Sequence, residues 1–269
     1  MHLLYTDEVN VDPEKSEFFV YAGVAIPGEN AAALSADIEA LRKRNGYKPG
    51  DVLKFNTVER PAHIQPAQHQ NAKRELMEAA AKHGVKLLAS FLLHNIVKDG
   101  DVDQARRNEI NRVSFHFNAW LQRVNDCGLV LIDTFTDANL TNHLREKFAI
   151  GVTGNLPFSK LLPLDRILGY HLASIGTSHF TSVIDVVLGG LRYAVNGRKE
   201  DRPVCKTLIR QLAPLCIAEG LKGNKASELS INWSPKGIKH PPYLAQYREL
   251  CAFLRENGID PAQEPSGAL

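Results

Sequence analysis

Residues 3–8 read LLYTDE and residues 18–27 read FFVYAGVAIP. The first run is apolar up to its acidic end, and the second is rich in aromatic and β-branched residues. A polar segment with the turn dipeptide Asp12-Pro13 lies between them. Two strand-like runs joined through a turn predict an antiparallel pair of strands at the start of the fold.

Beyond this pair, strand-like and helix-like segments alternate. Short apolar runs predict strands at 52–55, 85–93, 128–133 and 167–174. Apolar residues at helical spacing predict helices at 31–44, 66–83, 102–126, 139–148, 180–194, 201–219 and 242–257. The polar residues 222–239 predict a surface excursion, and the tail beyond Pro261 is predicted to be disordered. A strand pair followed by alternating elements predicts an α/β fold, with a mixed sheet that has helices on both faces.

The composition is that of an ordinary globular protein. Hydrophobic residues make up 44% of the 269 residues and charged residues 23%. No apolar run approaches the ~20 residues of a membrane-spanning helix, and the N-terminus lacks the features of a signal peptide. The four cysteines are far apart and form no CxxC pair, which favours free thiols in a reducing compartment. We therefore expect a cytoplasmic protein with no membrane partner.

The formal net charge of +2 does not by itself indicate a nucleic-acid partner. Basic residues do gather locally, at Arg42-Lys43-Arg44, at Arg106-Arg107, at Arg192 with Arg198-Lys199, and at Lys222 with Lys225. Such groups are usually solvated helix faces. They are also compatible with a phosphate-binding surface.

Three acidic residues lie at the end of an apolar run or within one. Asp7 and Asp133 each end an apolar run, and Asp185 lies within the segment VIDVVL at 183–188. A carboxylate in such surroundings is costly to desolvate unless a positive charge lies beside it. The carboxyl ends of strands are also the edge where ligands bind in open α/β sheets. Three converging carboxylates would form an oxygen site suited to Mg²⁺ or Mn²⁺.

Two further residues are candidates for the same site. Glu8 directly follows Asp7, and Lys54 ends its own predicted strand, where it could steer a phosphate or orient a carboxylate. Each candidate also has an ordinary structural interpretation. Asp7 and Glu8 can begin a turn, and Asp133 can start a loop through an Asx hydrogen bond. Asp185 can be the exposed position of a buried helix, and Lys54 a surface residue. Their joint placement favours a site.

Other catalytic motifs do not stand out. The histidines show no HxH or HExxH spacing, and Ser178 and Ser182 lie in no nucleophile elbow. Gly189-Gly190 falls inside a predicted helix, where it favours close packing. Without a Walker or GxGxxG loop, a nucleotide-driven motor and a dehydrogenase are disfavoured.

Four stretches of the chain resemble the DUF3800 family, prokaryotic proteins with a predicted RNase H-like fold. Residues 4–8 (LYTDE) are similar to its opening strand and Asp-Glu-Ser motif, and residues 18–27 are similar to its second strand. Residues 53–55 (LKF) resemble its Glu-Leu-Lys segment. Asp133 and Asp185 fit the later strand Asp and the Asp of the C-terminal helix.

The resemblance spans about residues 2–197. Val9 stands where the family has Ser, and Ser182-Val183-Ile184 stands where it has Gln-Leu-Ala. The resemblance implies an RNase H-like mixed β-sheet flanked by helices over residues 1–197. Residues 198–269 would then be a C-terminal helical extension packed on the same domain.

The leading hypothesis is a Mg²⁺- or Mn²⁺-dependent nuclease that hydrolyses phosphodiester bonds of RNA or DNA. Asp7, Asp133 and Asp185 would hold the metal. Glu8 would assist, and Lys54 would contact phosphate. By resemblance the setting would be a mobile element or phage defence, and the partners would be nucleic acid and either a second copy of the chain or a defence-system protein. Two alternatives stay open, a non-catalytic nucleic-acid- or protein-binding scaffold and a metal-dependent hydrolase of a small phosphorylated substrate.

Overall fold

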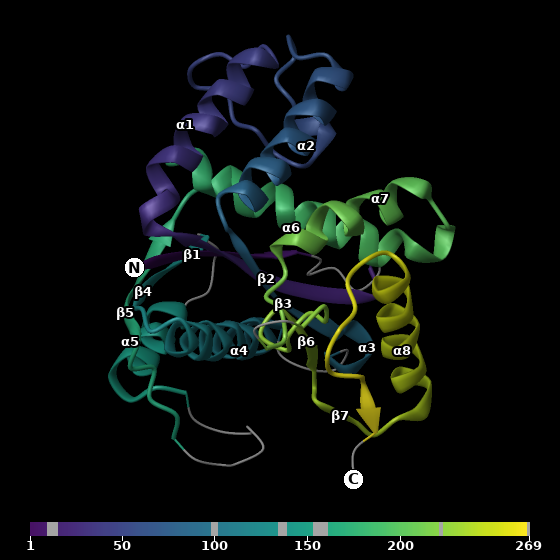
Figure 1. Ribbon diagram of the computed structural model, residues 1–269. Coiled ribbons are helices and arrows are strands. Elements are labelled where there is room, and N and C mark those ends of the chain that lie inside the picture. Colours follow the sequence, from purple (N-terminus) through teal and green to yellow (C-terminus); the bar gives the residue numbers. More distant parts are fainter. Residues whose placement is uncertain (10–15, 98–101, 134–138, 153–160, 221–222, 268–269) are drawn as a thin grey trace.

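The computed structural model describes residues 1–9, 16–97, 102–133, 139–152, 161–220 and 223–267. A six-stranded sheet lies between layers of helices (Figure 1). Its strands follow the order β5-β4-β1-β2-β3-β6. They are β1 (His2–Val9), β2 (Phe18–Pro27), β3 (Lys86–Leu93), β4 (Gly128–Asp133), β5 (Ile167–Ala173) and β6 (Ile231–Ser234).

The sheet is mixed. β1 pairs with β2, and β2 with β3, in antiparallel fashion, so the predicted antiparallel start is confirmed. β4 runs parallel to β1 and β5 parallel to β4, while β6 runs parallel to β3 at the opposite edge. Only β2 therefore runs against the other strands.

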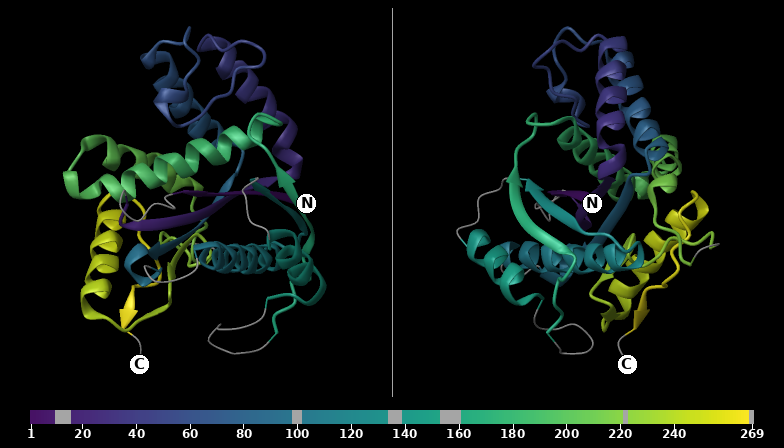
Figure 2. Two further views of the ribbon diagram at one scale, coloured as in Figure 1. Left: turned by 180° about the vertical axis from the view of Figure 1, so that it is seen from behind. Right: turned by 60° about the vertical axis from the view of Figure 1, so that its left-hand side comes forward.

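Helices cover both faces of the sheet, as the sequence predicts (Figures 1 and 2). α6 packs on β1 and β2, α7 packs beside α6, and the hairpin of α1 and α2 rises beyond them. α4 packs on the other face, with α5 beside it. The helices are α1 (Gly28–Arg44), α2 (Pro66–Lys82), α3 (His94–Val97), α4 (Val102–Arg123), α5 (Leu140–Ile150), α6 (His179–Gly197), α7 (Pro203–Leu212) and α8 (Pro241–Glu256).

Alternation along the strands separates two apolar cores. Leu4 of β1 and Val130 of β4 pack in the core on the α4 side. Tyr5 and Leu131, one residue further along each strand, pack in the core on the α6 side. Successive strand residues point to opposite faces, so odd-numbered positions of both strands over this stretch face α6.

Residues 52–55 do not form the predicted strand. Leu53 is fully buried, but the N–H of Phe55 donates to the carboxylate of Asp185 and not to a neighbouring strand. The segment belongs to the irregular link between α1 and α2, residues 45–65, which also contains a short 3₁₀ turn, Thr57–Glu59. The helix predicted over 201–219 ends at Leu212, because Pro214 lacks an N–H to continue it and a 3₁₀ turn, Ala213–Leu215, follows instead.

Two predictions for the C-terminal part are wrong. The expected surface excursion contains β6, all four residues of which are buried against the β3 edge. The tail is ordered as far as residue 267, because the Trp233 indole donates to the Gln263 carbonyl at 2.8 Å and β8 (Ser266–Gly267) pairs with β7 (Gly237–Ile238). Because both segments are polar in composition, nothing in the sequence indicated these contacts.

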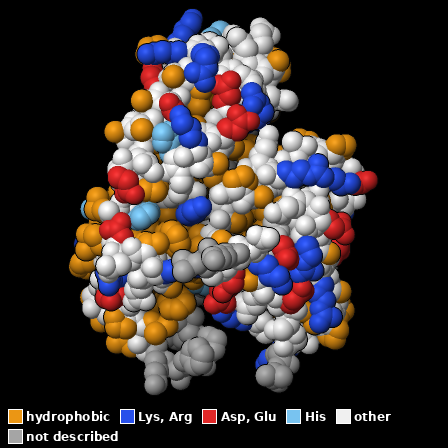
Figure 3. All heavy atoms as spheres, in the orientation of Figure 1, with side chains coloured by type: hydrophobic (Ala, Val, Ile, Leu, Met, Phe, Trp, Pro, Cys, Tyr) orange, Lys and Arg blue, Asp and Glu red, His pale blue; other side chains and the backbone are white. Residues whose placement is uncertain are grey.

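β5 forms the other edge of the sheet. Leu168 and Leu172 of this strand are 53% and 54% exposed, and Phe148 of α5 is 61% exposed. Figure 3 shows hydrophobic side chains gathered on this side of the molecule. Within the described ranges, no helix is both long and apolar enough to cross a membrane. All four cysteines are free thiols, as the sequence predicts.

Candidate metal and catalytic site

Asp7 and Asp133 lie side by side on neighbouring parallel strands. β1 and β4 keep their register through the pair Thr6 and Ile132, so Asp7 and Asp133 are the next pair along. Neighbouring strands are about 4.8 Å apart. Both side chains leave the sheet on the face covered by α6, because alternate residues of a strand share a face with Tyr5. The two carboxylates thus meet where β4 ends.

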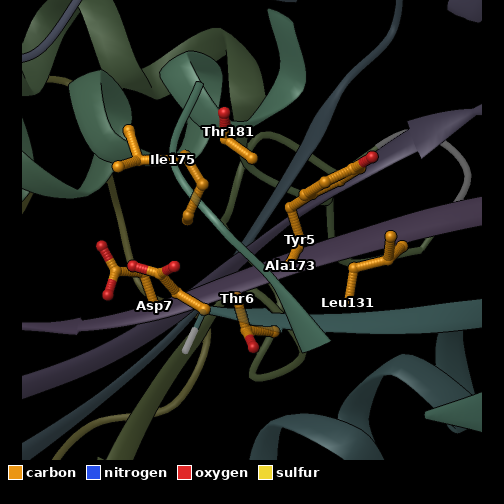
Figure 4. Close-up of a pocket in the computed structure, with 9 residues that line it drawn as sticks. Tyr5, Thr6, Asp7, Leu131, Ala173, Ile175 and Thr181 are labelled. Carbon is orange, nitrogen blue, oxygen red and sulfur yellow. The ribbon is translucent and has the colours of Figure 1, made fainter. Parts of the chain in front are cut away.

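A small pocket lies between these carboxylates and α6 (Figure 4). Figure 4 shows Asp7 beside Thr6 on β1, with Ile175 and Thr181 across the hollow. The volume of the pocket is about 10 Å³, the room of one water-sized sphere. The lining residues are Tyr5, Thr6, Asp7, Leu131, Asp133, Ala173, Ile175, Thr181 and Ile184.

Asp7 is hard to ionise in this setting. Burial, followed by the negative charge of Asp133, raises the pKa of Asp7 from 3.8 to about 7. The negative charges of Glu8 and Asp185 act in the same direction. The Glu8 N–H donates to Asp7 Oδ1 at 2.7 Å and offsets only part of this effect. A pKa near 7 leaves about half of the Asp7 carboxyls protonated at neutral pH.

Asp185 approaches the same region from α6. Its neighbours Ile184 and Val186 are buried in the core, whereas Asp185 faces the irregular link and accepts a hydrogen bond from the Phe55 N–H at 2.5 Å. Burial raises the pKa of Asp185, while this hydrogen bond and the positive charge of Lys54 oppose the rise. Its negative charge also contributes to the raised pKa of Asp7, so the two carboxylates lie within electrostatic reach of each other.

The contact between Asp185 and Phe55 depends on a glycine one helical turn further along α6. A Cβ atom added to Gly189 would lie 2.4 Å from the Cβ and 2.5 Å from the Cγ of Phe55. No side chain fits at that distance, so only glycine lets the link pack against α6 here. The glycine pair was predicted to serve close packing, and Gly189 does so.

We expect Gly189→Ala to lower the free energy of unfolding by about 1–3 kcal/mol, because the methyl group forces Phe55 off the helix. Urea denaturation followed by circular dichroism measures this change. Gly190→Ala is the matched control, since both changes gain the same helix propensity. Its Cβ would come closest to the flexible end of Met77, at 3.1 Å, and would meet Leu208 and Phe55 only at the ordinary contact distances of 3.5 and 3.6 Å. Equal losses in the two variants would contradict the packing role of Gly189.

Lys54 lies in the irregular link and not at a strand end. Its ammonium forms an ion pair with Glu59. The hydrogen bond to Glu59 raises the pKa of Lys54, and the negative charges of Asp185 and Asp133 contribute to the rise. Lys54 is therefore a stable cation within the electrostatic reach of Asp133 and Asp185. Its predicted place at the end of a strand is wrong, and its role of steering a phosphate or orienting a carboxylate stays a prediction.

The structure does not bring Glu8 to the pocket. Glu8 follows Asp7 on β1, so its side chain leaves the sheet on the opposite face. There its Oε1 forms an ion pair with the Arg106 Nε of α4 at 3.1 Å. Glu8 was predicted to assist at the site, but in the structure it acts on the pocket only through its negative charge, which raises the pKa of Asp7.

Two residues of this region were not predicted. Glu59 is the ion-pair partner of Lys54, and Phe55 supplies the N–H that holds Asp185. The apolar run that contains Phe55 is typical of a strand, and nothing in it indicates that one backbone N–H binds a carboxylate of a distant helix. The 3₁₀ turn around Glu59 also lies outside every motif that the sequence contains.

The fit of a divalent ion can be judged from these side chains. Within the described part of the chain, no group of three or more His, Cys, Asp or Glu side chains is already arranged to hold a metal ion. Asp7 and Asp133 nevertheless offer hard oxygen donors, which Mg²⁺ and Mn²⁺ prefer. Their mutual repulsion raises the pKa of Asp7, and a cation between them would relieve it. The donor set therefore fits a divalent ion at this pair, with Asp185 nearby on α6.

No protein-family model matches the chain, and no curated protein matches it. Among solved structures, it is similar to Bst-RNase HIII in complex with Mn²⁺, with 10% sequence identity and a TM-score of 0.41 over 79% of this chain and 61% of that one. It is also similar to RNase HII in the PCNA:RNase HII complex from Archaeoglobus fulgidus, with 11% identity and a TM-score of 0.41 over 79% of this chain and 88% of that one. The chain thus spans about three fifths of the length of RNase HIII.

The strand order itself identifies the fold class. β5-β4-β1-β2-β3, with β2 running against the others, is the arrangement of an RNase H-like α/β fold, here extended by β6. The predicted RNase H-like mixed sheet flanked by helices is therefore confirmed.

Proposed function

We propose that this chain is a metal-dependent nuclease that hydrolyses phosphodiester bonds of nucleic acid. The observation that carries the proposal is the pair of Asp7 and Asp133, two crowded carboxylates at adjacent strand positions beside a pocket of about 10 Å³. The raised pKa of Asp7 supports it, because strongly perturbed carboxylates are typical of functional sites. Asp185 and Lys54, whose charges interact with the pair, complete the set.

In this proposal Asp7 and Asp133 hold Mg²⁺ or Mn²⁺, and Asp185 adds an oxygen ligand from α6. Such an ion supplies an activated water and stabilises the leaving oxygen of the cleaved phosphodiester. Lys54 binds the phosphate by exchanging Glu59 for a phosphate oxygen, since both ligands are anionic acceptors. Membership of the DUF3800 family, a cytoplasmic location and a role in defence or mobile elements belong to the same proposal.

Calorimetric titration with Mn²⁺ tests the metal site directly. We expect saturable binding to the wild-type chain and at least about tenfold weaker binding to Asp133→Asn, because one charged ligand is lost. Asp165→Asn is the control, since Asp165 is an exposed carboxylate that does not line the pocket. Absence of saturable uptake by the wild type would remove the metal from the proposal.

A non-catalytic scaffold is the second candidate function. It is favoured by the absence, within the described residues, of a fully assembled cluster of three metal ligands. A substrate panel separates the possibilities. Cleavage of single-stranded and duplex oligonucleotides with Mn²⁺ supports the nuclease, and cleavage of mononucleotides alone supports a small-substrate hydrolase. A chain that binds the oligonucleotides but cleaves nothing is a scaffold.

A further inference from the structure

A second and much larger hollow is lined in part by Phe55. Its volume is about 690 Å³, within the roughly 300–1,000 Å³ of typical ligand pockets. The residues that line it come from α2, α6, α7 and the link at 55–57. We call this hollow the α2–α7 groove.

The charged side chains that line the α2–α7 groove are all positive. Lys73, Arg74 and Arg192 line it, and none of the described lining residues is acidic. Arg74 forms an ion pair with Glu78, whereas the Arg192 guanidinium has no hydrogen bond or ion pair with any residue in the described ranges. A recess with a cation available in this way is suited to an anionic ligand.

Two aromatic rings lie in the same wall. The rings of Phe55 and Tyr193 have centroids 6.2 Å apart, and both line the groove. Each ring has a cation packed against it. Lys73 donates to the Phe55 carbonyl at 3.0 Å with its Nζ 4.5 Å from the ring centroid, and Arg202 donates to the Tyr193 hydroxyl at 2.8 Å. Fixed aromatic faces of this kind are platforms on which unstacked bases bind.

One stripe of α6 runs from Asp185, beside the carboxylate site, to Arg192 in the lining of the groove. Asp185, Gly189 and Arg192 are spaced by four and three residues, so they share a face of the helix. Seven residues of helix are about 10 Å long. Phe55 packs on this stripe at Gly189, with its N–H directed to Asp185 and its ring in the groove wall. Arg192, which lines the groove, therefore lies about 10 Å along α6 from Asp185.

We infer that the α2–α7 groove binds a single-stranded segment of nucleic acid adjacent to the cleaved phosphate, with Arg192 on a backbone phosphate and Tyr193 stacked on a base. The inference rests on the proposed nuclease function for what happens at the carboxylates. A duplex hides the faces of its bases, so stacking on Tyr193 requires an unpaired strand. The amide side chains of Gln70 and Gln211 and the amide nitrogen of Asn56 line the same recess and can bind base edges.

The test is the fluorescence anisotropy of a labelled 12-nucleotide single strand, with EDTA present so that no cleavage occurs. We expect Arg192→Gln to weaken binding about tenfold and to make the slope of log K against log salt shallower by about 0.7, as for one lost phosphate contact. Tyr193→Leu should also weaken binding about tenfold, but leave that slope unchanged, because stacking releases no counterions. Arg248→Gln, an exposed arginine of α8 outside the groove, should bind as the wild type does.

Several results would overturn the inference. One is wild-type affinity in both groove variants, and another is an equal loss of affinity in Arg248→Gln. A third is competition by blunt duplex or by polyglutamate that is as effective as competition by unlabelled single strand. Thermal melting by circular dichroism verifies that each variant is folded. Cleavage assays on the same proteins keep the two proposals apart. If the wild type cleaves but Arg192→Gln and Tyr193→Leu bind the single strand normally, only the groove inference is wrong. If the two variants bind more weakly but the wild type cleaves nothing in Mn²⁺, only the nuclease proposal is wrong.

Discussion

Asp7→Asn is expected to reduce cleavage of an oligonucleotide in Mn²⁺ or Mg²⁺ by about 1,000-fold or more. The change keeps the size of the side chain and its ability to accept from the Glu8 N–H, but it removes one of the two charges that face each other across β1 and β4. A ligand that stabilises charge in the transition state through a metal ion typically has an effect of this size. Initial rates at saturating metal measure the loss.

Glu8→Gln is the matched control, because Glu8 is the adjacent carboxylate on the same strand but lies on the opposite face with Arg106. Its cleavage rate should stay within about threefold of the wild type. Thermal melting ensures that the loss of the Arg106 ion pair has not unfolded the chain. If both substitutions abolish cleavage, or if Asp7→Asn remains fully active, the assignment of the site to the α6 face is wrong.

Asp7→Asn should also make the metal-free chain more stable than the wild type at alkaline pH. Asp7 has a pKa of about 7 in the folded chain, against the ordinary 3.8 that applies when the chain is unfolded. The unfolded chain therefore releases this proton at lower pH than the folded chain does. Stability is unaffected below pH 3.8, falls as the pH rises towards 7, and stays low above it. The largest possible loss is about 4 kcal/mol.

Urea denaturation in EDTA at pH 4.5 and pH 8 measures this effect. We expect Asp7→Asn to exceed the wild type by about 2–4 kcal/mol at pH 8 and by much less at pH 4.5, where Asp7 stays protonated in the folded chain. Added Mn²⁺ should stabilise the wild type at pH 8 and have little effect on the variant, because ligands stabilise the state that binds them. A pH-independent difference between the two proteins would show that burial and the charge of Asp133 do not raise the pKa of Asp7.

The positions of Asp7 and Asp133 could be predicted because each follows an apolar run at the place where a parallel strand ends. Asp185 could be predicted from the apolar helix that surrounds it. The role of Glu8 could not, since its neighbour on the strand is equally acidic and only the alternation of side chains separates the two faces. The pattern at 52–55 indicated a strand because apolar content alone does not reveal that Asp185 takes the Phe55 N–H.

The C-terminal errors have a different physical origin. β6 is four residues long and stands in polar sequence, and it is specified by its contacts with β3 and by Tyr247, which accepts from the Leu93 N–H at 2.8 Å. Contacts over such distances in the chain leave no local periodicity. The same is true of the groove, whose lining residues come from four separate segments.

The late arrival of β6 has a consequence for biosynthesis. During translation, β3 leaves the ribosome well before residues 231–234, which cover its edge from Ala89 to Leu92. At about 5–20 residues per second, this edge waits on the order of 10 s for its partner strand. An uncovered edge is a template for pairing with other chains. Nascent chains on one polysome are therefore most exposed to mutual aggregation in this interval, when a chaperone that shields β3 would raise the yield of native protein.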